Sequence, residues 1–137
     1  MTDLVGFLRA RLDEDEAAAL AAFAGPWTVG AHPDGIRSVV LSPYARVVAT
    51  TFREADAAHV ARHDPARVLA DVAAKRAILD MWEDPEEARE PGSNGQEGRD
   101  ADEIEADVAV AYAITDIVAA FAAVYAGHPD YREEWTP

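Results

Sequence analysis

The segment that decides the fold is residues 25–52, GPWTVGAHPDGIRSVVLSPYARVVATTF. β-Branched and aromatic residues gather there in three short runs, which turn residues separate: 27–29, 36–41 and 44–52. His32-Pro33-Asp34-Gly35 is a turn signal, and Ser42-Pro43 marks the second break. Because the gaps suit hairpins, the pattern predicts a three-stranded antiparallel meander.

Helical patterns lie on both sides of this segment. Leucines at helical spacing predict a first helix from Thr2, its N-cap, to about Phe23. Leu20 and Phe23 are expected to continue its apolar stripe. A short helix is expected over 54–63. Asp64-Pro65 then starts a longer one that ends near Trp82, since Asp is a favoured N-cap and Pro a favoured first helical residue.

The predicted fold class is therefore α+β. It has an N-terminal helix and a three-stranded antiparallel meander, and then a short helix and two longer helices packed on the sheet. Three strands alone are not stable in water, which is why helices must cover them. We expect one domain, residues 1–137, because the length suits one hydrophobic core.

Most of the negative charge lies in one segment. Between Glu83 and Asp107 there are eleven acids and two arginines, a net charge of −9 out of −14 for the chain. Residues 84–102 are rich in Pro, Gly and Glu, which predicts a mobile acidic loop. The charge disfavours nucleic-acid binding. The loop either keeps the protein soluble or imitates nucleic acid toward a host protein.

The composition also excludes several chemistries. The chain has no cysteine, so disulfides, thiolate zinc sites and cysteine nucleophiles are absent. Its three serines lie outside any Gly-x-Ser-x-Gly elbow, and its glycines form no phosphate-binding loop. We therefore expect a non-enzymatic protein without a cofactor. No signal-peptide pattern follows Met1, so we expect a cytoplasmic location.

Histidines supply the one candidate metal site. His59 and His63 are four residues apart, a spacing that places two imidazoles on one helix face. Asp64 follows directly, and His128 and Asp130 could join from the C-terminal tail to bind zinc or another divalent metal. Structural roles explain the same residues: Asp64 as a helix cap, His63 at a helix end, and His128 as a cation near a helix C-terminus.

A locally basic surface is a second candidate site. Five of the twelve basic residues fall within 24 positions: Arg53, Arg62, Arg67, Lys75 and Arg76. They could bind a small anion such as a nucleotide, or an acidic partner. The alternative is a solvated helix face.

The last predicted helix, from about Asp102 to Tyr125, carries two apolar stripes. Val110, Ile114, Ile117, Phe121 and Val124 form one, and Ile104, Val108, Ala111 and Val118 form the other. Such a helix is either central in its own fold or shared with a partner. A central Asp and abundant alanine disfavour a membrane span. We expect a homodimer through this helix.

The order of four landmarks is familiar: residues 3–16 (DLVGFLRARLDEDE), 25–27 (GPW), 56–69 (DAAHVARHDPARVL) and 128–135 (HPDYREEW). Together they resemble a family of uncharacterised proteins common in Streptomyces-like actinobacteria and their phages, a domain of unknown function. A partial likeness, from Gly-Pro-Trp through strands to the helix at Asp56, extends to Ead/Ea22-like phage accessory proteins. The resemblance implies an accessory role in phage or mobile-element biology and brings no catalytic residue.

Overall fold

The computed structural model describes residues 2–82, 84–88 and 100–137. The chain divides into two compact units, each of which is described by itself. We call Leu12–Ala73 the sheet unit, and Met1–Arg11 together with Ala74–Pro137 the terminal unit. Two helices, α1 (Thr2–Ala21) and α3 (Pro65–Leu79), contribute residues to both units.

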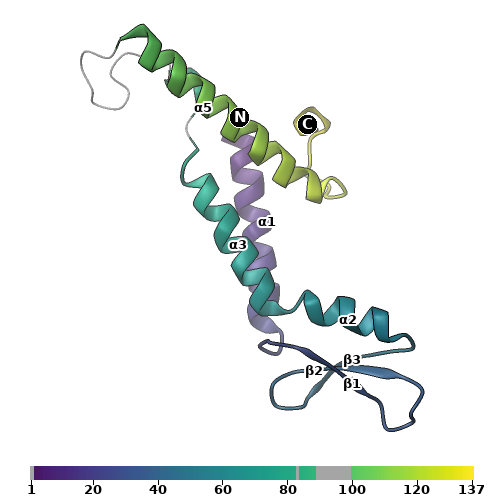
Figure 1. Cartoon of the computed structure of the whole chain (residues 1–137). Coiled ribbons are helices and arrows are strands. Elements are labelled where there is room, and N and C mark those ends of the chain that lie inside the picture. The colour runs from purple at the N-terminus through teal and green to yellow at the C-terminus, as the bar shows by residue number, and fades with distance from the viewer. Residues whose placement is uncertain (1, 83, 89–99) are drawn as a thin grey trace. The chain divides into compact units, whose positions relative to one another are not determined.

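The sheet unit contains the predicted meander (Figure 1). Strands β1 (Thr28–Ala31), β2 (Ser38–Leu41) and β3 (Val47–Thr51) pair antiparallel in the order β1-β2-β3. Val40 stands opposite Val29 on one side and Ala49 on the other. Val39 and Val40 are both buried, and because consecutive strand residues point to opposite faces, both faces of the central strand are covered.

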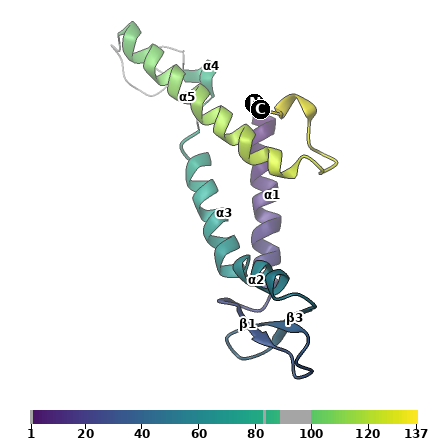
Figure 2. The ribbon, with the colours of Figure 1, turned by 45° about the vertical axis from the view of Figure 1, so that its right-hand side comes forward.

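The element packed on all three strands is the short helix α2 (Glu54–Arg62). Figure 2 shows it lying along the sheet, and its Ala57 is fully buried. This is the short helix predicted over 54–63, and it lies on the sheet as expected. Its central alanine allows the close approach that three short strands need.

Asp64 connects the start of the sheet with the start of α3. One carboxylate oxygen, Oδ1, accepts a hydrogen bond from the backbone N–H of Arg67 at 2.9 Å, which caps α3 as predicted. The other, Oδ2, accepts the backbone N–H of Trp27 at 3.1 Å, just before β1. A Cβ on Gly25 would lie 2.6 Å from this Oδ2, so the close approach requires glycine. One buried carboxylate thus ties the start of the sheet to the start of α3.

The terminal unit is built around α5 (Ala101–Ala122), which a single 3₁₀ turn, η1 (Ala123–Tyr125), extends. Asp100 caps α5 by accepting the backbone N–H of Glu103 at 2.9 Å. The buried stripe of α5 has the spacing of a helix face: Val108, Ala111, Thr115, Val118 and Ala122. Its one polar member is satisfied, since Thr115 Oγ1 accepts Trp82 Nε1–H at 3.1 Å and donates to the Ala111 carbonyl at 2.9 Å.

The C-terminal tail packs on the first turns of α1 (Figure 2). Phe7 lies at the centre of an aromatic cluster, with its ring centroid 5.1 Å from that of Trp135 and 5.9 Å from that of Tyr131. Trp135, in the 3₁₀ turn η2 (Glu133–Trp135), is buried. Arg132 Nη1 forms an ion pair with Asp3 Oδ2 at 2.9 Å.

Two sequence expectations need correction. The segment 84–102 is not loop throughout, because it contains the short helix α4 (Pro85–Ala88), which packs against α5, and the start of α5 itself. Residues 89–99, the rest of the expected mobile loop, lie outside the described residues. Leu20 and Phe23 do not resume the buried stripe, since they are 67% and 46% exposed. At roughly 100° per residue, Leu20 is rotated about 160° from Leu4 on the same helix.

The double role of Asp64 makes it a sensitive position. We expect Asp64→Ala to lower the free energy of unfolding by about 2 kcal/mol, because it removes a helix cap and leaves the Trp27 N–H without an acceptor. Urea unfolding followed by circular dichroism measures the change. Asp56→Ala, which removes an exposed carboxylate from α2, is the matched control. Equal midpoints for the two variants would contradict the assigned role.

Candidate functional site

The five predicted metal ligands belong to different units. His59, His63 and Asp64 lie in the sheet unit, and His128 and Asp130 lie in the terminal unit. In the part of the chain that the structure describes, no group of three or more His, Asp or Glu side chains is arranged to hold a metal ion. The five-residue set stays a prediction, and each half is described in its own surroundings.

His59 and His63 lie together on α2 and its C-cap. Their ring centroids are 4.4 Å apart, and His63 Nδ1 lies 2.9 Å from the carbonyl oxygen of His59. Since a carbonyl only accepts, His63 Nδ1 is the donor in this contact. Asp64 is a poorer metal ligand, because both of its carboxylate oxygens already accept backbone hydrogen bonds. The sheet unit therefore presents an exposed histidine pair.

His128 lies against a buried arginine. Arg11 Nη1 contacts both ring nitrogens, at 2.7 Å for Nδ1, and Nδ1 also accepts the backbone N–H of Asp130 at 3.1 Å. A guanidinium only donates and a neutral imidazole has one acceptor nitrogen, so Arg11 hydrogen-bonds to at most one of the two ring nitrogens. A metal ion at this nitrogen would displace Arg11 and meet its positive charge. The pattern of spacing alone missed this contact, which joins residues 117 positions apart.

A cavity of about 360 Å³ opens beside this contact in the terminal unit. Its walls include two guanidiniums, two carboxylates and two aromatic rings: Arg11, Arg132, Asp3, Asp130, Phe7 and Trp135. The charges compensate one another, since Arg132 pairs with Asp3 and its guanidinium lies 5.3 Å from the centre of the Trp135 ring. The lining is explained by the docking of the tail on α1, and its charge balance selects no ion of either sign.

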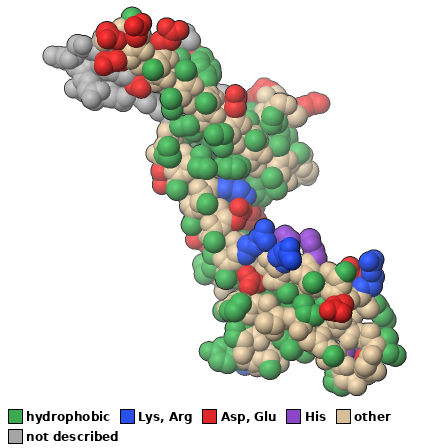
Figure 3. All heavy atoms as spheres, viewed as in Figure 1, with side chains coloured by type: hydrophobic (Ala, Val, Ile, Leu, Met, Phe, Trp, Pro, Cys, Tyr) green, Lys and Arg blue, Asp and Glu red, His purple; other side chains and the backbone are tan. Residues whose placement is uncertain are grey.

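The five basic residues also divide. Arg53, Arg62 and Arg67 belong to the sheet unit, where Figure 3 shows basic and histidine side chains gathered over α2. Lys75 and Arg76 belong to the terminal unit, and Lys75 Nζ lies 5.7 Å from the centre of the Phe121 ring on α5. An anion or acidic partner on these residues stays a prediction.

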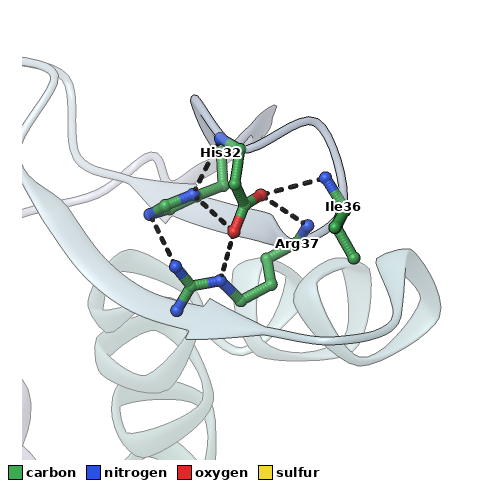
Figure 4. Close-up of polar contacts among 4 residues, drawn as sticks. His32, Ile36 and Arg37 are labelled. Carbon is green, nitrogen blue, oxygen red and sulfur yellow. Dashed lines mark hydrogen bonds and ion pairs between the residues drawn. The ribbon is translucent and has the colours of Figure 1, made fainter.

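A polar cluster that the sequence marked only as a turn lies between β1 and β2 (Figure 4). The Gly35 N–H donates to the His32 carbonyl at 3.0 Å, with Gly35 at a φ of 69°. Asp34 Oδ1 accepts the backbone N–H groups of Ile36 and Arg37 at 2.9 and 3.0 Å, and Oδ2 pairs with Arg37 Nε at 2.6 Å. His32 Nδ1 lies 3.1 Å from the same oxygen.

These contacts define the chemistry of Asp34. The backbone hydrogen bonds from Arg37 and Ile36, followed by the Arg37 side chain, hold the pKa of the Asp34 carboxyl far below its usual range. Such a carboxylate stays ionised and is too weak a base for proton transfer near neutral pH. The cluster therefore stabilises the turn.

The remaining candidate is the outer face of α5. The side opposite the buried stripe carries Val110, Ile117 and Val124, which are 56%, 42% and 73% exposed. Figure 3 shows apolar side chains along the visible part of this helix and acidic ones at its N-terminal end. In the described chain, Ala101–Tyr125 is the one helix long and apolar enough to cross a membrane, and 28% of its apolar window is buried. The sequence predicted both stripes, and the structure buries one of them.

The Asp34 turn yields a pH prediction. Because the pKa of Asp34 is lowered on folding, its contribution to stability is complete above the unfolded pKa, about 4, and is lost as the pH falls below it. Urea unfolding should therefore show a larger difference between wild type and Asp34→Asn at pH 7 than at pH 3. Asp56→Asn is the control for removing an exposed carboxylate. A difference that grows toward pH 3 would contradict the assignment.

Comparison with known proteins gives a family and no function. No curated protein and no solved structure matches the chain. One protein family matches, and it does so over residues 1–137. The whole chain therefore belongs to the family of unknown function DUF6221.

Proposed function

We propose that this protein is a non-enzymatic interaction protein that self-associates through the outer face of α5. The observation that carries the proposal is the second apolar stripe, which is exposed along a helix whose opposite side is buried. Burying a valine or isoleucine side chain gains about 1.5–3 kcal/mol relative to leaving it in water. Association through Val110, Ile117 and Val124 would recover a part of that free energy at each residue.

A protein partner suits this face better than a lipid bilayer. The N-terminal turns of α5 carry Asp102, Glu103, Glu105 and Asp107, and Asp116 lies near the middle of the helix. An aspartate at the centre of a membrane costs about 2.5–3.5 kcal/mol. In a protein complex the same carboxylates stay at the rim, where water reaches them. The apolar stripe is therefore interpreted as a protein-binding surface.

The chemistry of the described polar groups supports a non-enzymatic role. Ser42 Oγ is buried and has no hydrogen-bond partner among the described residues, so no base there activates it as a nucleophile. Asp34 is held ionised by its turn. Asp64, which is buried, accepts two backbone hydrogen bonds with its carboxylate.

We place this interaction protein in the cytoplasm, in an accessory role linked to phage or mobile-element biology in actinobacteria. The support is the resemblance in residues 3–16, 56–69 and 128–135, and the acidic composition suits a soluble accessory protein. Its genetic neighbourhood tests this context: proximity to phage, defence or replication genes is expected, and a constant position among genes of central metabolism would contradict it.

The histidine pair on α2 favours a second candidate function, the binding of a divalent metal. Because their rings are 4.4 Å apart, His59 and His63 could share one zinc ion whose other positions are filled by water or by a further ligand. The same helix carries Arg62, so a small anion is the alternative ligand for this region.

Zinc titration tests the metal site. If His59 and His63 bind zinc, the ion should raise the melting temperature of the wild type, and His59→Ala should abolish the shift. His128→Ala reports on the tail, because it removes part of the shift if His128 joins the set and none of it if the pair acts alone. An unchanged melting temperature of the wild type with excess zinc would exclude this function.

Self-association is tested by a matched pair of substitutions on α5. Ile117→Lys places a charge in the outer stripe, whereas Tyr112→Lys places the same charge on an equally exposed residue about 140° away around the helix. Tyr112 Oη lies 3.4 Å from Glu86 Oε1, so a lysine at position 112 has a carboxylate beside it.

In sedimentation experiments at high micromolar concentration, we expect wild type and Tyr112→Lys to form dimers and Ile117→Lys to sediment as a monomer. Circular dichroism shows whether each variant keeps its helix content. Dimers that persist in a folded Ile117→Lys variant would remove the outer stripe as the contact.

A further inference from the structure

We infer that the partner on the outer face of α5 is a second copy of this chain in antiparallel orientation, an inference that rests on the proposed self-association. The outer stripe alternates small and branched side chains at spacings of four and three residues: Ala106, Val110, Ala113, Ile117, Ala120 and Val124. All six are exposed. This is the spacing of a coiled-coil seam, in which each side chain fits between residues of the facing helix.

The stripe is symmetric about Thr115. When the helix is turned end for end about that position, Ala106 faces Val124, Val110 faces Ala120 and Ala113 faces Ile117. Every small residue therefore meets a branched one on the partner. A two-fold dimer requires such self-complementarity, because the same patch must fit itself. Asp116 lies beside the stripe, where water can reach its carboxylate.

Charge distinguishes the two possible orientations. The N-terminal turns of α5 carry four acids, Asp102, Glu103, Glu105 and Asp107, which a parallel dimer would place beside their own copies. The antiparallel register moves them to the opposite end of the partner helix, where position 107 stands across from position 123. That end carries the Lys75 ammonium, 5.7 Å from the centre of the Phe121 ring. Acids and a cation then face each other along the edge of the contact.

The length of the stripe limits the affinity. From Ala106 to Val124 the helix rises about 27 Å. A single helix face of this length buries less surface than a typical stable interface, which buries about 800 Å² per partner. We therefore expect a dissociation constant on the order of 10 µM, with no dimer at nanomolar concentration.

Disulfide trapping tests the orientation, since the natural chain has no cysteine. Two full-length variants, Val110→Cys and Ala120→Cys, are oxidised separately and as a mixture, and the products are separated on a non-reducing gel. A disulfide requires Cα atoms about 4.4–6.8 Å apart. In the antiparallel dimer Val110 faces the partner's Ala120, whereas two copies of residue 110 lie about 15 Å apart along the axis.

The antiparallel dimer predicts a cross-linked band in the mixture several-fold stronger than in either variant alone. Cross-linking of each variant with itself, and not across the mixture, would indicate a parallel dimer and overturn the inference while leaving the proposed self-association intact. Wild type that stays monomeric at high micromolar concentration would overturn both. Wild type that floats with phosphatidylcholine vesicles instead of dimerising would assign the stripe to a lipid surface and also overturn both.

Discussion

Helix α5 imposes the constraint on which this account depends: it is apolar on two opposite sides, and its own unit covers one of them. Val108, Ala111, Val118 and Ala122 are buried, while Val110, Ile117 and Val124, about 135° around the helix, remain in contact with water. A 22-residue helix with acids at its start cannot hide the second side in a bilayer at low cost. Burial of the exposed outer stripe would therefore favour association with a partner.

The sheet unit depends on different interactions, made by two aspartates. Asp64 caps α3 and accepts the Trp27 N–H, while the loop at Asp34 is closed by backbone donors and Arg37. Asp64 and Asp34 are both short polar side chains that accept hydrogen bonds from backbone N–H groups where regular structure begins or reverses. These contacts describe how the sheet unit is held together, and the proposed function rests instead on the exposed surface of α5.

Local chemistry explains what could be predicted from the sequence. Turn residues and β-branched runs predicted the meander, Asp64-Pro65 predicted the start of α3, and the two stripes of α5 followed from the helical repeat. Long-range contacts could not be predicted. Arg11 meets His128 across 117 positions, and the exposure of Leu20 follows from the gradual rotation of a helix whose leucines are four residues apart. Spacing grouped the histidines without showing what else each one contacts.

The central claim is that α5 brings two copies of the chain together. The most direct test is sedimentation equilibrium of the unmodified protein over a range from nanomolar to high micromolar concentration. The account predicts a mass that rises from 14.8 kDa toward twice that value as the concentration increases. A mass that stays at 14.8 kDa throughout would contradict it.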